Sequence, residues 1–141
     1  MDDSVQSPEI NTFSLAVLRD RLLPDLLQED EANILYWAGK GLATRESLTS
    51  ITTIEVYFNR AGFGNLKALA HKGSEIEWIL SGPVVLARLT ERDEPNFYLE
   101  AGFLAQVIET LANVGTETTL KIEDEEVHFT TLCEQAIDLP I

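Results

Sequence analysis

The amino-acid sequence predicts an α+β domain in which helices pack on one side of an antiparallel sheet. Apolar residues recur at helical spacing up to about residue 62, whereas residues 63–90 contain short β-prone runs separated by glycine turns. A long apolar helix around residues 97–109 and a hairpin at 116–134 follow. The expected order is therefore three helices, three strands, one helix and two strands, a separation typical of the α+β class.

The first helix is predicted to follow a polar, acidic opening, MDDSVQSPE, which offers little to bury. We expect residues 1–11 to form a mobile tail and residues 12–141 to form one domain, because 141 residues with 45% hydrophobic content suffice for one core. The run SLAVLRDRLLPDLLQ has leucines at helical spacing, and Pro24 removes one backbone donor within it. A first helix that is kinked or split near Pro24 follows from this pattern.

The second helix is predicted over EDEANILYWAGKGLATR, which has acids in its first turn and basic residues near its end, as the helix dipole favours. A helical wheel directs Tyr36 and Lys40 away from the apolar stripe of this helix. That stripe consists of Ile34, Leu35, Trp37, Ala38, Gly41 and Leu42. Because Gly41 lies inside the stripe, we expect close helix packing there.

The third helix, TSITTIEVYFNRAG, carries a mixed signal. Its β-branched residues favour a strand, but Ile51, Ile54 and Phe58 follow helical spacing, so we favour a helix. Thr52 with Glu55 could form a capping box at its start. The adjacent Gly62 would end it.

Three antiparallel strands are predicted in residues 63–90. The turns Lys72-Gly73-Ser74 and Ser81-Gly82-Pro83 divide this region into three β-prone runs. In the second run, Ile76, Trp78 and Leu80 share one face, as expected for a half-buried sheet. The closing hairpin, TETTLKIEDEEVHFTTLCE, shows the same alternation.

The fourth predicted helix, FYLEAGFLAQVIE, is apolar over more than half of its circumference, which places it at the centre of the fold. Glu100 lies within the apolar arc, so it must be paired, protonated, or close enough to the helix start to accept backbone N–H groups. With Asn96 as a cap, we favour the third arrangement. Gly102 costs about 1 kcal/mol of helix stability relative to alanine, which indicates that a helix, a partner chain or a ligand approaches its backbone.

Composition excludes several classes of partner. With 10 basic and 24 acidic residues the net charge is −14, which disfavours nucleic acid and anionic membranes. The single cysteine and the lack of a signal-peptide pattern indicate a cytoplasmic protein. Apolar runs fall short of the ~20 residues of a membrane span. No membrane insertion is expected.

Motifs for metal binding or catalysis are weak. His71, His128 and Cys133 have no ligand spacing, and strand alternation puts His128 on the face opposite Cys133. No nucleophile elbow or phosphate-binding glycine loop is present. The acidic run at residues 123–126 lacks a calcium-loop pattern and indicates a solvated turn. We expect no metal, no cofactor and no catalytic residue.

Four stretches resemble a known family. LLPDLL, ILYWAGKGLA, FNRAGFGNL and FYLEAGFLAQVIE together resemble the YslB-like family of Gram-positive bacterial proteins, over nearly the whole chain after residue 11. That family is similar in fold to the nitric-oxide-signalling and Golgi-transport ligand-binding superfamily, with its TRAPP and four-vinyl-reductase-type domains. The resemblance implies a TRAPP-like fold, an apolar pocket and often a homodimer.

The resemblance also bears on cofactors. Four-vinyl-reductase-type domains carry cysteines in the final hairpin, where this chain has Thr118, Leu120 and Val127. Haem binding by the more distant relatives would need a histidine on a helix, and neither His71 nor His128 is expected on one. The resemblance therefore implies neither group here, and it supplies no catalytic residue.

The sequence thus predicts a cytoplasmic, non-enzymatic module that binds an apolar small molecule or acyl chain between its helices and sheet. A homodimeric scaffold without a ligand, using the helix face around Trp37 and Gly41, is the alternative, and an enzyme is the least favoured reading. The same aromatic residues could instead fill a dry core. The residues expected to line or border the ligand space are Trp37, Phe58, Phe63, Trp78, Leu99, Glu100, Gly102 and Phe103.

Overall fold

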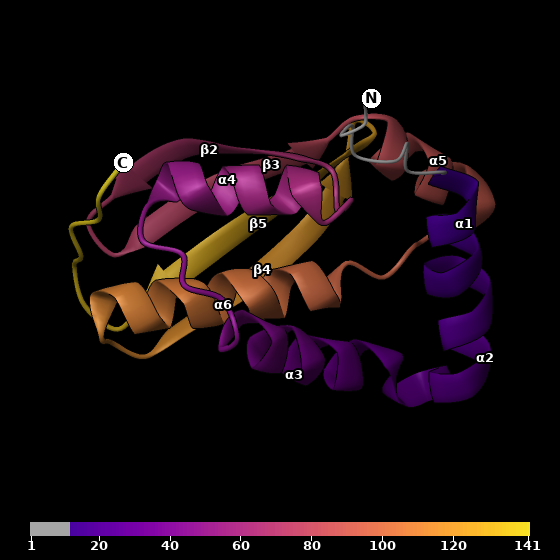
Figure 1. Cartoon of the computed structure of the whole chain (residues 1–141), viewed down its shortest axis with the longest axis horizontal. Coiled ribbons are helices and arrows are strands. Elements are labelled where there is room, and N and C mark those ends of the chain that lie inside the picture. The colour runs from indigo at the N-terminus through magenta and orange to yellow at the C-terminus, as the bar shows by residue number, and fades with distance from the viewer. Residues whose placement is uncertain (1–11) are drawn as a thin grey trace, which may run out of the picture.

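The chain folds as a layer of helices over one face of an antiparallel sheet (Figure 1). The computed structural model describes residues 12–141, so the tail expected at residues 1–11 lies outside the described residues. Within that part the sheet has four strands in the order β2-β3-β5-β4. The strands are β2 (Asn65–Lys72), β3 (Glu75–Ser81), β4 (Thr116–Glu123) and β5 (Glu126–Cys133).

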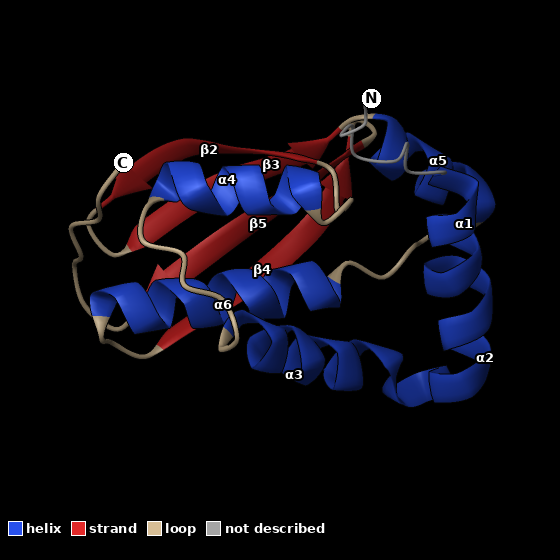
Figure 2. Cartoon of the chain, in the orientation of Figure 1, coloured by secondary structure: helices blue, strands red, loops and turns tan. Residues whose placement is uncertain are grey.

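The described residues contain eight helical segments. They are α1 (Thr12–Ala16), η1 (Val17–Leu22), α2 (Leu23–Leu27), η2 (Gln28–Asp30), α3 (Glu31–Ala43), α4 (Ile51–Arg60), α5 (Pro83–Glu91) and α6 (Tyr98–Ala112). Helix α4 packs on β2 and α6 on β4, while α3 lies against α6 and α1 against α5 (Figure 2). The predicted α+β class, with helices on one side of an antiparallel sheet, is confirmed.

The third predicted strand is wrong, because residues 83–91 form α5. Gly82 has φ = +105°, a conformation that breaks β3, and Pro83 occupies the first turn of the helix, where its missing N–H costs nothing. Val85 and Arg88 then share the buried face at helical spacing. Tertiary packing thus overrides the β-propensity of the valines.

The first predicted helix is continuous but contains a wider turn before its proline. η1 is a π-helical segment, and the N–H of Leu23 bonds to the carbonyl of Leu18, five residues back. Such a turn lets the helix continue past Pro24, which cannot donate a backbone hydrogen bond. The helix is therefore distorted near Pro24 without ending there.

The N-cap of helix α4 lies two positions before the predicted one. The capping box pairs Ser50 with Thr53, through bonds of 3.2 Å and 3.0 Å, and not Thr52 with Glu55. Glu55 instead accepts the backbone N–H of Ala68 in β2 at 2.9 Å. The predicted stop is confirmed, since Gly62 adopts φ = +79° directly after Ala61.

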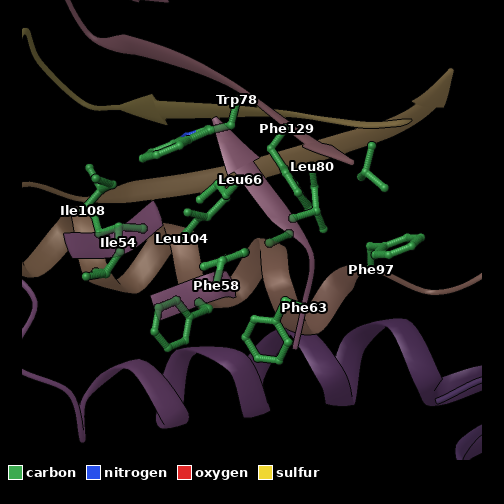
Figure 3. Packing of buried hydrophobic residues seen from close by; sticks show 14 of the residues in the cluster. Ile54, Phe58, Phe63, Leu66, Trp78, Leu80, Phe97, Leu104, Ile108 and Phe129 are labelled. Carbon is green, nitrogen blue, oxygen red and sulfur yellow. The ribbon is translucent and has the colours of Figure 1, made fainter. Parts of the chain in front are cut away.

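The core lies between α4, α6 and the sheet (Figure 3). Trp78 is fully buried at its centre and donates its indole N–H to Thr131 Oγ1 at 3.0 Å. Thr131 in turn bonds Thr118 on β4 at 2.9 Å, so the polar atoms of this core are satisfied. Other apolar side chains of the same core include Ile54, Phe58, Phe63, Leu66, Leu80, Leu104, Ile108 and Phe129.

Helix α3 is rotated relative to the prediction. Its buried face contains Leu35, Gly39 and Lys40. Trp37, by contrast, is 70% exposed, and a Cβ added to Gly41 would have no neighbour within 4 Å. The expectations that Lys40 points away and that Gly41 marks close packing are wrong. The apolar stripe predicted the wrong face, because the closest contact of α3 is made by Gly39, which has no side chain and so adds little to a hydrophobic pattern.

Candidate functional site

Helices α3 and α6 cross through a pair of glycines. A Cβ on Gly102 would lie 1.9 Å from the carbonyl oxygen of Tyr36, and a Cβ on Gly39 would lie 2.0 Å from that of Leu99. Both distances are far shorter than any non-bonded contact, so only glycine fits at either position. The prediction that something approaches the backbone of Gly102 is confirmed, and of the three options the neighbour is a helix.

Glu100 projects from the first turns of α6 into a buried ion network. Arg19 of η1 donates two hydrogen bonds to its carboxylate, from Nη1 to Oε2 at 2.9 Å and from Nη2 to Oε1 at 2.8 Å. Arg88 of α5 approaches Oε2 at 3.6 Å. Glu100 is therefore paired mainly with arginines, whereas the predicted interaction with a backbone N–H at the helix start makes only a smaller contribution.

The same network joins α5 to η1. Arg88 donates from Nε to Asp20 Oδ2 at 2.9 Å and from Nη2 to Oδ1 at 3.0 Å, a bidentate pair with both side chains fully buried. The carbonyl oxygen of Asn96 accepts from Arg88 at 2.6 Å and from Arg19 at 3.2 Å. Two arginines and two carboxylates thus balance one another in the interior.

The electrostatics of the network favour its ionised form. Burial would raise the pKa of the Glu100 carboxyl, but the guanidinium groups of Arg19 and Arg88 outweigh burial and hold that pKa below its ordinary value. Burial alone would lower the pKa of Arg19, but the carboxylate of Glu100 outweighs burial, so the pKa of Arg19 is raised above its ordinary value. Burial, followed by the charge of Arg19, lowers the pKa of Arg88. With Glu100 ionised and fully paired, it has no role as a proton donor.

An aromatic cluster fills the space between α4 and α6. Phe103 of α6 stacks on Tyr57 at 4.8 Å between ring centroids and 13° between planes. It also meets Phe58 and Phe63 edge-on, at 5.6 Å and 6.4 Å. Each geometry is one that aromatic quadrupoles prefer. Phe103 is thus the centre of a cluster whose other rings come from α4 and the segment just after it.

Tyr57 connects this cluster to the surface. A groove of about 300 Å³ lies over α4 and is lined by residues of α4 and of the segment before it. Tyr57 belongs to this lining and is half-buried, with its other contacts in the cluster. Burial and the neighbouring Glu46 raise the pKa of its hydroxyl, so Tyr57 is neutral at physiological pH. The other groove residues are Glu46, Leu48, Thr52, Thr53, Val56 and Arg60.

The structure brings three of the eight predicted site residues into this cluster, namely Phe58, Phe63 and Phe103. The others lie elsewhere. Trp78 is in the sheet core, Trp37 is at the surface of α3, and Leu99 and Gly102 are at the α3–α6 crossing, while Glu100 belongs to the ion network.

Sequence reasoning missed Tyr57 and the partners of Glu100. Tyr57 directly precedes Phe58 and was hidden by the helix-or-strand ambiguity of its segment. Arg88 gave a usable signal, since it is the one charge in the run PVVLARLT. Pairing it with Asp20 across the sequence needs the structure.

The histidines do not fit a haem or metal site. His71 lies on β2 and His128 on β5, so neither projects from a helix beside the aromatic cluster. In residues 12–141 no group of three or more His, Cys, Asp or Glu side chains converges closely enough to hold a metal ion. Over the same residues, no helix is long and apolar enough to cross a membrane.

The architecture is shared with domains of the sensory and vinyl-reductase type. The phenol-responsive sensory domain of the transcription activator PoxR superposes with a TM-score of 0.67 at 12% identity, covering 90% of this chain and 76% of that one. A vinyl-4-reductase family protein from Methanocaldococcus jannaschii gives 0.62 at 17% identity, covering 92% and 85%. An H-NOX protein from K. algicida gives 0.54 at 11% identity, covering 90% and 75%. At these identities the likeness establishes the fold.

The sequence comparisons establish the family. Residues 12–132 match the family described as proteins of unknown function, DUF2507, and the chain belongs to this family. It is 38% identical over 109 residues to the uncharacterized protein YslB of Bacillus subtilis (strain 168), covering 77% of this chain and 74% of YslB. The predicted resemblance to YslB is confirmed.

Proposed function

We propose that the chain is a non-enzymatic module that binds a small apolar molecule, of aromatic size, between α4 and α6. The observation that carries this proposal is the ring of Tyr57, which forms part of the groove over α4 and stacks flat on Phe103. Tyr57 occupies the position that a planar ligand entering from the groove would take. The structural relative PoxR is phenol-responsive, and this supports a ligand of similar size.

The energetics allow such an exchange. A stacked aromatic pair contributes about 0.5–1.5 kcal/mol beyond its buried area, and swinging Tyr57 out of the stack also re-exposes the buried part of a ring that is already partly exposed. A ligand ring placed on Phe103 would restore that stacking and bury its own apolar surface, at roughly 25 cal/mol per Å². Phe58 and Phe63 would then contact the ligand edge-on, as they contact Phe103 now.

Native mass spectrometry of the untreated purified protein, combined with titration by indole, tests this proposal. We expect an adduct that is lost on denaturation. Tyr57→Ala should open the site and raise the affinity for indole about tenfold, the change given by 1.4 kcal/mol. Val56→Ala is the matched control, since Val56 lies in the same groove but is 51% exposed and outside the aromatic cluster.

Two results together would overturn this function. They are wild-type protein of bare sequence mass, and a folded Tyr57→Ala protein with no measurable affinity for indole. In that case the aromatic cluster is simply core.

A homodimer is the second candidate function, and exposed leucines favour it. Leu18, Leu22 and Leu26 form an apolar stripe on η1 and α2, and Ile34 is exposed on α3. Exposed apolar side chains gathered on neighbouring helices are typical of interaction surfaces. The sequence instead predicted a dimer face around Trp37 and Gly41, and Trp37 lines a different hollow together with residues of β4.

Size-exclusion chromatography with light scattering tests the homodimer. A concentration-independent dimer is expected for the wild type, and Leu22→Glu should convert it to a monomer. Val56→Glu adds the same charge to an exposed position on α4 and should leave the dimer intact. A wild-type monomer at all concentrations would remove this candidate.

A further inference from the structure

Strand β4 has an open edge. It is the last strand of the sheet, and its alternate residues direct both N–H and C=O away from β5. The first two outward N–H groups have partners, since Thr116 donates to Glu109 Oε1 at 3.2 Å and Thr118 to Tyr36 Oη at 3.1 Å. The next two belong to Leu120 and Ile122, and no residue of the described chain accepts them.

The opposite edge of the sheet, strand β2, is protected against the addition of another strand, whereas the β4 edge is not. Strand β2 has a register shift between Ala68 and Ala70, and Glu55 caps the N–H of Ala68 at 2.9 Å. A bulge and an inward carboxylate are two devices by which proteins prevent strand addition. The β4 edge at Leu120 and Ile122 has neither.

A hollow lies directly beside this open edge. It measures about 450 Å³ and is bordered by Leu120, Ile122, Tyr98 and the segment 92–96. An adjoining hollow of about 240 Å³ shares Tyr98 and extends to Trp37. Because side chains alternate across a sheet, every second side chain of an added strand would point to the face of Leu120 and Ile122, into these hollows.

The rim of the hollow is acidic. Asp93 and Glu94 border it and are exposed. Glu117 borders the adjoining hollow and its side chain is 70% exposed, with the ammonium of Lys40 at 3.8 Å. The basic group on the rim, Arg92, is engaged by Glu31 at 3.1 Å. A net charge of −14 adds to the same field.

Aromatic rings at the rim suit cations as well. Tyr98 and Trp37 are exposed at the junction of the two hollows. The ammonium of Lys40 already lies 5.5 Å from the ring centroid of Trp37, which shows that this ring accepts a cation. The acidic rim and the aromatic rings therefore both favour a cationic side chain, that of lysine or arginine.

We propose that the β4 edge at Leu120–Ile122 binds an extended, lysine- or arginine-bearing segment of a partner protein, which adds a fifth strand to the sheet. The outward amides and carbonyls of Leu120 and Ile122 supply backbone pairing, and the hollows receive alternate side chains. The carboxylates of Asp93 and Glu94 supply selectivity for basic side chains. This surface is separate from the Tyr57 groove.

Amide hydrogen exchange followed by NMR tests the proposal on the full chain. The probe is a synthetic peptide of alternating lysine and valine, with a glutamate–valine and a lysine–proline peptide as controls. At saturation the lysine–valine peptide should slow exchange of the Leu120 and Ile122 amides about tenfold. The control peptides should not, because one has the wrong charge and the other lacks every second backbone donor.

Two protein variants separate backbone pairing from charge. Ile122→Pro removes the outward N–H, whereas Ile122→Ala shortens the same side chain and keeps the N–H. Ile122→Pro should therefore bind the peptide about tenfold more weakly than Ile122→Ala does. If Ile122→Pro does not fold, Asp93→Asn with Glu94→Gln provides the test, with weaker binding and unchanged Leu120 protection at saturation expected.

Three outcomes overturn the proposal. They are unchanged exchange at Leu120 and Ile122 with the lysine–valine peptide, equal binding of the lysine–proline peptide, and protection that appears without peptide as the protein concentration rises. The last result would assign the edge to a second copy of this chain.

Discussion

At the residue scale, Glu100 shows how a buried charge is accommodated. Its side chain is fully buried, yet it accepts two hydrogen bonds from Arg19 and lies 3.6 Å from Arg88. Burying an isolated carboxylate would cost far more than the net stability of a domain this size, so the arginines are a condition of its presence. Glu100 thus fixes the start of α6 relative to η1 and α5.

Replacing Glu100 tests the network directly. Glu100→Gln should destabilise the protein by about 3–5 kcal/mol, because it removes the main counter-charge of the buried Arg19, while Arg88 keeps Asp20. Arg19→Met combined with Glu100→Leu should recover most of that loss, since an apolar pair needs no compensation. Urea unfolding of the three proteins measures both effects. A double variant less stable than Glu100→Gln would contradict this account.

Acid should reduce the stability that the Glu100 carboxylate contributes to the fold. Its folded pKa lies below the ordinary value of 4.5, so its stabilisation is fully present above that pH and is lost as pH falls through the folded pKa. The difference in unfolding free energy between wild type and Glu100→Gln should stay constant from neutral pH to about 5 and narrow below it. Urea unfolding across this range measures the difference. A gap that persists undiminished into strong acid would mean that the carboxylate charge does not carry the effect.

At the scale of elements, the α3–α6 crossing is set by two glycines facing two carbonyls. Gly102 meets Tyr36 and Gly39 meets Leu99, so each helix carries one glycine and one opposing carbonyl. Lys40, next to Gly39, is also buried, and its ammonium lies 3.8 Å from Glu117 on β4 and 5.5 Å from the ring centroid of Tyr36.

Alanine substitutions distinguish the glycines. Gly102→Ala and Gly39→Ala should each cost about 3 kcal/mol or more, because a Cβ would overlap a backbone carbonyl and force the helices apart. Gly41→Ala, on the same helix but with open space around it, should stabilise by about 0.5–1 kcal/mol. Thermal unfolding compares all three. Equal effects at Gly39 and Gly41 would contradict the crossing geometry.

The elements also show which parts of the fold the sequence determines locally. The hairpin of β4 and β5 and the long helix α6 were predictable, because alternation and helical periodicity continue over many residues. The segment 83–91 was not, because its valines favour a strand while Gly82 and Pro83 favour a helix start, and packing of Arg88 decides between them. The face of α3 was mispredicted because Trp37 is exposed.

The candidate site was predictable only in part for a similar reason. Phe58, Phe63 and Phe103 could be singled out as apolar residues of the central region, and the structure brings them together. The roles of Arg19 and Tyr57 depend on contacts between distant segments, and one sequence carries no signal for such pairings. Periodicity along the sequence predicts helices and strands, whereas the site depends on contacts between residues far apart in the sequence.

At the scale of the whole molecule, net charge is the dominant feature. With 24 acidic and 10 basic residues, the folded chain concentrates 14 uncompensated negative charges on a small surface. Self-repulsion of this kind destabilises the compact state and is screened by salt over a Debye length of about 10 Å at 0.1 M.

Salt should therefore stabilise the protein. Raising sodium chloride from low to physiological concentration is expected to increase Tm by roughly 2–4 °C, the shift that about 1 kcal/mol produces in a domain of this size. Exposed pairs such as Lys121–Glu123 weaken under the same conditions, but single surface pairs contribute little. Differential scanning calorimetry measures the shift. A fall in Tm with salt would mean that ion pairs outweigh the net repulsion.

The ion network also orders events during synthesis. Arg19 and Glu100 are 81 residues apart, and Asp20 and Arg88 are 68 apart, so residues 12–27 have no partner for their buried charges until α5 and α6 have been synthesised. These residues are thus secured late relative to when they are made. Until then the charges of Arg19 and Asp20 lack the partners that compensate them in the fold, which makes residues 12–27 the described segment whose packing depends most on residues synthesised later.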